Sequence, residues 1–131
     1  MTTNVEALIE YRLGRARESL DEARLLSAGG HWNTCANRLY YACYYAVNAL
    51  LASRDLAASK HTGVRALLGQ HFVRTGQLSK ERGAFYNDLF ESRQESDYQD
   101  FFTMKPETVG PWVDQTAGFI NEIERLRSYQ Q

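Results

Sequence analysis

Tyrosines and an arginine recur at helical spacing in a segment that otherwise has the composition of a buried helix. The segment NRLYYACYYAVNALL, residues 37–51, holds four tyrosines and one arginine among small and aliphatic residues. Arg38, Tyr41 and Tyr45 follow one another at steps of three and four, so a helix would place them along one edge. A buried tyrosine needs a partner for its hydroxyl, and a guanidinium suits phosphate or carboxylate. The pattern predicts a polar seam, an interface or a ligand surface on this edge.

A second arginine extends an apolar row late in the chain. Phe85, Leu89 and Arg93 lie four residues apart, so Arg93 is expected to face inward, where a charge needs a partner. Asp97 follows four residues later, and Tyr98 comes next. One interpretation is an ion pair between Arg93 and Asp97 that fixes the end of the helix. The other interpretation is a binding role for Arg93.

The two stretches together predict a ligand site. Arg38 and Arg93 could hold one phosphate of a nucleotide or of RNA through bidentate contacts, if their helices share a polar cavity. Hydroxyl groups at the same site are predicted to come from Tyr41, Tyr45 and Tyr98.

The elements that must position these residues are predicted to be helices. Apolar residues recur at steps of three and four nearly everywhere, and no segment alternates as a strand does. Gly29 and Gly30 are expected to end the first helix, and Ser79 to cap the fourth. We expect an all-α, up-and-down antiparallel bundle of about five helices, forming one domain over residues 1–131. The expected helices are 5–28, 32–53, 64–76, 80–98 and 111–129.

Composition excludes several classes of protein. Lys plus Arg number 15 and Asp plus Glu number 16, so bulk charge gives no argument for DNA or an anionic membrane as partner. No apolar run approaches the ~20 residues of a membrane span. Cys35 and Cys43 lie eight residues apart on one helix, about 12 Å, which a disulfide cannot bridge. No CxxC pair, glycine-rich phosphate loop or pair of catalytic carboxylates is present. We therefore expect a cytoplasmic protein without a metal or other cofactor.

Three segments in order make the sequence resemble the HEPN domain family, in particular its small stand-alone prokaryotic members. They are ANRLYYACYYAVNALL at 36–51, KHTGVRALLGQHFVRTGQLS at 60–79 and SRQESDY at 92–98. The resemblance implies a helical bundle that often pairs as a homodimer and is commonly encoded beside a minimal nucleotidyltransferase. Many members of the family are metal-independent ribonucleases, some of them toxins, and others are binding modules.

The ribonuclease branch of that family carries an arginine followed, after four to six residues, by a histidine late in the bundle. In the corresponding segment this chain has Arg93, and Asp97 stands where the histidine would be, with Tyr98 after it. A carboxyl group with an ordinary pKa of about 4 is ionised near neutral pH and cannot donate a proton there. This departure from the pattern favours binding over cleavage.

The three histidines all follow an arginine at the spacing of that motif, so spacing alone does not choose among them. His31 and His71 are expected to be a surface residue and a packed residue. His61 is the strongest catalytic candidate because it lies near the start of a helix, where phosphate is favoured.

Two functions follow for the whole chain. The first is a binding module for a nucleotide or RNA, or for a nucleotidyltransferase in a toxin–antitoxin-like pair. Its predicted binding residues are Arg38, Tyr41, Tyr45, Arg93 and Tyr98. The alternative is a metal-independent endoribonuclease toxin that uses Arg93 with His61 or Asp97. Either would form a homodimer through the tyrosine-bearing helix or the late helices.

Overall fold

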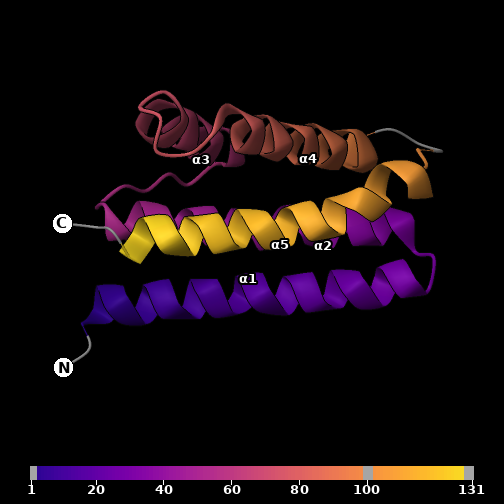
Figure 1. Ribbon diagram of the computed structural model, residues 1–131, viewed down its shortest axis with the longest axis horizontal. Coiled ribbons are helices and arrows are strands. Elements are labelled where there is room, and N and C mark those ends of the chain that lie inside the picture. Colours follow the sequence, from indigo (N-terminus) through magenta and orange to yellow (C-terminus); the bar gives the residue numbers. More distant parts are fainter. Residues whose placement is uncertain (1–2, 99–101, 129–131) are drawn as a thin grey trace.

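Four long helices that alternate in direction form the body of the molecule (Figure 1). The computed structural model describes residues 3–98 and 102–128, although not the side chains of residues 97 and 98, and within this part all regular structure is helical. A short helix lies in the connection between the second and third long helices. The predicted all-α bundle is therefore confirmed. The helices are α1 (Asn4–Ala28), α2 (Trp32–Ser53), α3 (His61–Leu68), α4 (Lys80–Tyr98) and α5 (Pro106–Ser128), and α3 continues into a π-helical turn, η1 (Gly69–Val73).

Helix α2 lies at the centre and contacts each of the other four α-helices. Its predicted apolar stripe is fully buried, and consists of Leu39, Cys43, Ala46, Val47 and Leu50. Both cysteine thiols are buried and unbridged, as the spacing predicts, and burial raises the pKa of each. In residues 3–98 and 102–128, no helix combines the length and the apolar character needed to cross a membrane.

Local capping explains where the helices begin and end. The backbone N–H of Glu6 donates to Thr3 Oγ1 over 3.0 Å, and the N–H of Thr3 donates back to the Glu6 carboxylate, which starts α1 with a capping box. Gly30, at φ 77°, supplies the left-handed residue after α1. Ser79 Oγ accepts from the N–H of Arg82 over 3.2 Å, so the predicted cap of α4 is present.

Three predicted boundaries, on two helices, were wrong. The third helix begins at His61 rather than at residue 64, and its regular part ends at Leu68, because a π turn follows. Helix α5 begins at Pro106 rather than at Pro111. A proline at the first position of a helix lacks only an N–H that would have no intrahelical acceptor. The fully buried Val109 then packs this first turn onto the core, so Pro111 lies inside the helix instead of starting it.

Candidate functional site

Tyr40 of α2 is the centre of an aromatic cluster that includes a histidine from α3. Its side chain is fully buried, and its hydroxyl oxygen lies 2.6 Å from Nδ1 of His61, the first residue of α3. The imidazole ring stacks on Tyr44, with ring centroids 4.3 Å apart and 15° between the planes. Two rings of α2 thus fix the position of the His61 ring.

The buried hydroxyls of this region stay protonated at neutral pH. Burial raises the pKa of Tyr40 to about 12. Burial also raises the pKa of Tyr86 on α4, whose ring stacks on Phe119 of α5 at 5.9 Å. Tyr40 is therefore a neutral hydrogen-bonding group beside His61, and not a source of negative charge.

Arg93 of α4 lies against the same tyrosine. Its guanidinium carbon is 5.3 Å from the centroid of the Tyr40 ring, within the range of a cation–π contact. The Arg93 side chain is only partly buried. The fold therefore brings Arg93 and His61, predicted from separate parts of the sequence, to the same residue of α2. We call Tyr40, Tyr41, Tyr44, His61 and Arg93 the tyrosine–histidine cluster.

Arg38 is joined to the cluster through Tyr41. The Arg38 guanidinium lies over the Tyr41 ring at 5.2 Å and pairs with Glu22 of α1 at 3.5 Å. Tyr41 in turn meets Tyr40 edge-on at 5.2 Å and His61 at 5.9 Å. A partly exposed cation thus lies at one border of the cluster.

Tyr45, also predicted as a binding residue, is occupied by α1. Nη2 of Arg15 donates to the Tyr45 hydroxyl over 3.3 Å, and the guanidinium lies 5.1 Å from the ring centroid. The Tyr45 ring still touches Tyr41 and Tyr44. Its hydroxyl, however, faces a different cation from the one beside Tyr40.

Asp97 and Tyr98 lie in the last turn of α4, and their side chains fall outside the described residues. The ion pair of Arg93 with Asp97 and the binding role of Tyr98 remain predictions. In the described part of the chain, no three His, Cys, Asp or Glu side chains form a group that could hold a metal ion.

Tyr40 and Tyr44 are the site residues that sequence reasoning missed. Neither residue lies on the predicted edge that Arg38, Tyr41 and Tyr45 define. Both tyrosines contact His61, which belongs to a different helix. Helical periodicity describes one helix at a time and does not predict contacts between helices. The available signal was the excess of tyrosines in one helix, because every buried hydroxyl needs a partner.

The sequence matches the model of a known protein family over most of its length. The model of the HEPN domain matches residues 9–126, and the chain belongs to this family. The chain is similar to the UPF0332 protein of Thermotoga maritima, with 44% identity over 121 residues that make up 92% of each chain. It is 31% identical to "Putative toxin MJ0605" of Methanocaldococcus jannaschii, over 92% of this chain and 87% of that protein. It is 27% identical to "Putative toxin MJ0142" of the same organism, over 89% of this chain and 80% of that one.

Proposed function

We propose that this chain is a toxin-like HEPN module that binds RNA or a nucleotide at the tyrosine–histidine cluster. The observation that carries the proposal is the meeting of His61 and Arg93, from α3 and α4, at the buried Tyr40. Arginine binds phosphate through charge-assisted hydrogen bonds, and aromatic rings offer faces on which bases stack. The toxin names of the two Methanocaldococcus jannaschii relatives support the same class of function.

Fluorescence anisotropy with a labelled single-stranded RNA tests the binding proposal. Arg93→Ala should weaken binding about ten-fold, since a hydrogen bond to a charged group contributes about 1.5–3 kcal/mol. The same change should lower the slope of log K against log salt by about 0.7, the value expected for one lost phosphate contact on a single strand. Arg74→Ala is the matched control, because Arg74 is exposed and lies outside the cluster. Equal affinities of the two variants would contradict the proposal.

A second function, metal-independent RNA cleavage, gains support from the neighbourhood of His61 and Arg93. An imidazole can take the proton of a ribose 2′-hydroxyl near neutral pH, and the resulting oxygen bonds to the adjacent phosphorus. The bond to the 5′ oxygen then breaks, and that oxygen takes up a proton, leaving a 2′,3′-cyclic phosphate. A guanidinium stabilises the charge that develops on the phosphate oxygens.

Cleavage and binding are measured on the same RNA in excess chelator. For an endoribonuclease, we expect 2′,3′-cyclic phosphate ends that disappear in His61→Ala while RNA affinity is retained. Loss of cleavage in Asp97→Ala, with His61→Ala active, would assign the proton transfer to Asp97 instead. An intact RNA in the presence of wild-type protein would leave binding alone as the function.

Homodimer formation and pairing with a minimal nucleotidyltransferase belong to the same proposal. Partly buried tyrosines along α2, and the cation at the border of the cluster, provide surface for such contacts. Light scattering tests the homodimer: a mass of 15.0 kDa at every concentration would reject it. Co-purification with a nucleotidyltransferase encoded beside this chain tests the second partner, with Arg38→Ala expected to weaken the complex and Arg74→Ala to leave it intact.

A further inference from the structure

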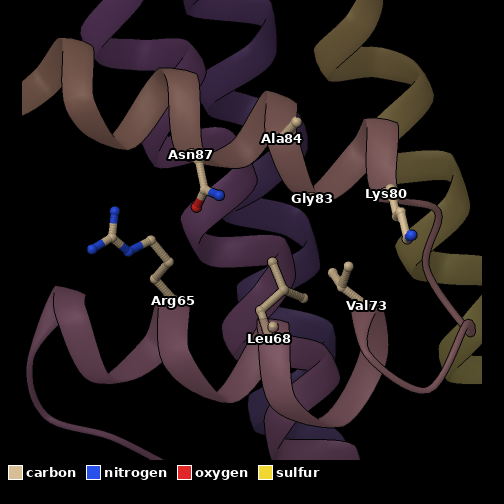
Figure 2. Close-up of a pocket in the computed structure, with 8 residues that line it drawn as sticks. Arg65, Leu68, Val73, Lys80, Gly83, Ala84 and Asn87 are labelled. Atoms are coloured by element: carbon tan, nitrogen blue, oxygen red, sulfur yellow. The ribbon is translucent and has the colours of Figure 1, made fainter.

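A cleft between α3–η1 and α4 lies outside the tyrosine–histidine cluster. Figure 2 shows it from the side, with its floor on α3 and η1 and its roof on α4. The cavity measures about 220 Å³. It shares no lining residue with the cluster, so any role of this cleft goes beyond the proposed RNA site. The lining residues used below are Arg65, Leu68, Gly69, Val73, Lys80, Gly83 and Asn87.

The π turn η1 shapes the floor of the cleft. The N–H of Arg74 donates to the carbonyl oxygen of Gly69 over 2.8 Å, five residues back rather than four. Leu68 and Val73 are five residues apart, and both line the cavity, whereas a regular α-helix would turn two such residues to different faces. Single π turns inside α-helices are frequent at functional sites. The π turn therefore brings two apolar side chains to one cavity: Leu68, which is 2% exposed, and the more exposed Val73.

One of the two glycines in the cleft, Gly83, lies at the closest approach of α4 to η1. A Cβ on Gly83 of α4 would lie 2.9 Å from Val73 Cγ2, so only glycine allows η1 to approach α4 at this point. A Cβ on Gly69 would meet no atom within 4 Å. The two elements thus touch at one side of the cleft and leave space at the other.

Two cationic side chains and one amide line the cavity above this apolar floor. Arg65 and Lys80 lie on opposite sides of the cavity, and the Asn87 amide points toward it from α4 (Figure 2). Arg65 is held by Glu91 at 3.1 Å and by the ring of Phe90 at 4.0 Å. Lys80 and Asn87, in contrast, make no side-chain hydrogen bond or ion pair with any residue that the structure describes. These two polar groups are thus available to a ligand.

The direction of α4 adds to the preference for an anion. The helix begins at Lys80, so the positive end of its dipole lies at the rim of the cleft. The carboxylate of Glu91 is already paired with Arg65. A ligand with a negative group at the Lys80 end is therefore favoured.

The size and lining of the cleft define its occupant. Its volume is below the range of about 300–1,000 Å³ that small-molecule sites occupy, so the cleft suits one inserted side chain better than a whole small molecule. No lining residue is aromatic, so a base would find no ring to stack on. We propose that the cleft binds a polypeptide partner, which inserts one apolar side chain over Leu68 and Val73 and places a neighbouring carboxylate at Lys80 and Asn87.

Blocked tetrapeptides test this proposal by amide chemical shifts of the ¹⁵N-labelled protein. The probe is acetyl-Glu-Leu-Glu-Leu-amide, which offers the apolar anchor and the carboxylate together. We expect saturable shifts at Gly69, Gly83 and Asn87. The glutamine peptide acetyl-Gln-Leu-Gln-Leu-amide and the alanine peptide acetyl-Glu-Ala-Glu-Ala-amide each lack one of the two features, and each should bind about ten-fold more weakly, or about 1.4 kcal/mol.

Two variants of the cleft complete the test. Lys80→Glu reverses the charge at the rim, and Gly69→Leu puts a side chain into the open space. Both variants should bind acetyl-Glu-Leu-Glu-Leu-amide about ten-fold more weakly, or weaker still. Lys105→Glu and Gly14→Leu are the matched controls, since both positions are exposed and outside the cleft, and a Cβ on Gly14 also meets nothing within 4 Å. Thermal unfolding of all four variants checks that each of them folds.

Several outcomes would overturn the proposal. These are the absence of saturable shifts at the cleft, equal binding of the glutamine peptide, and variants that bind the probe as well as their controls do. Inorganic phosphate that shifts the same amides as strongly would assign the cleft to a phosphate group instead. Loss of RNA binding in Lys80→Glu, with Lys105→Glu unaffected, would make the cleft part of the RNA site.

Discussion

The two sides of α2 differ in the kinds of side chain that pack there. Toward α1, Ile9 and Leu13 pack on Ala49, and the small side chain of Cys35 reaches the carbonyl oxygen of Ala23 over 3.3 Å. Toward α3 and α4, the same helix offers Tyr40, whose hydroxyl and ring contact two further polar residues. Apolar packing dominates the side toward α1, and the polar contacts there, Arg15 with Tyr45 and Glu22 with Arg38, are only partly buried. The tyrosine side gives a site that depends on a few polar contacts.

The largest expected effect lies on the side of α1. Leu20→Ala removes a side chain that is 1% exposed, and should lower the free energy of unfolding by about 2–5 kcal/mol through lost burial and the remaining cavity. Chemical denaturation measures this loss. The folded variant should bind RNA as the wild type does, because α1 supplies no ring to the cluster. Leu25→Ala, on the same helix at 76% exposure, is the control and should change stability little.

The next effect lies on the tyrosine side. Tyr40→Phe keeps the ring but removes the hydroxyl that contacts His61, which should lower the free energy of unfolding by about 1 kcal/mol. RNA affinity should fall as well, because His61 loses the group that orients its ring. Tyr11→Phe, at 61% exposure, provides the control. If both variants bound RNA like the wild type, the hydrogen bond of Tyr40 would have no part in binding.

Alkaline pH should lower the stability of the protein through Tyr40, on the tyrosine side of α2. The folded pKa of Tyr40, about 12, lies above the ordinary tyrosine value of about 10. The protonated form is thus favoured by folding, so its contribution to stability is complete below about pH 10 and is lost as the pH rises toward 12. Denaturation between pH 9 and 12 should show a fall in stability that Tyr40→Phe makes shallower. Equal slopes for the two proteins would contradict the assignment.

The smallest effect is expected at the exposed ion pairs. Asp21 and Arg24 of α1 lie 3.2 Å apart, with side chains 73% and 51% exposed. Asp21→Ala should change the free energy of unfolding by less than about 1 kcal/mol. Added salt should reduce even this difference, because exposed charges are screened. A larger loss would mean that Asp21 has a further role in α1.

Features that depend on local sequence were predictable. The buried stripe of α2 follows from helical spacing alone, and the cap at Ser79 from its chemistry and place in the sequence. The π turn was not predictable, because the close approach of Val73 to Gly83 is a tertiary contact. The start of α5 was missed for a related reason: burial of Val109 outweighs the usual reading of Pro111 as a boundary.

The candidate site also contains residues that the sequence predicts and one that it does not. Arg93 and His61 could each be singled out from the sequence, by an arginine in an apolar row and by a histidine near a helix start. Their common neighbour Tyr40 could not, because two separate interhelical contacts define it. Interhelical geometry is therefore the information that the sequence pattern lacked.

The short connection between α1 and α2 has a kinetic consequence. Only residues 29–31 separate these two helices, so their contacts close a small loop and are expected to form early in folding. The bond between Tyr40 and His61 requires α3 to dock, after a longer connector. Refolding followed by hydrogen exchange should therefore protect α1 and α2 before α3. An incompletely folded chain, such as one still emerging from the ribosome, would lack the tyrosine–histidine cluster and with it the proposed RNA site.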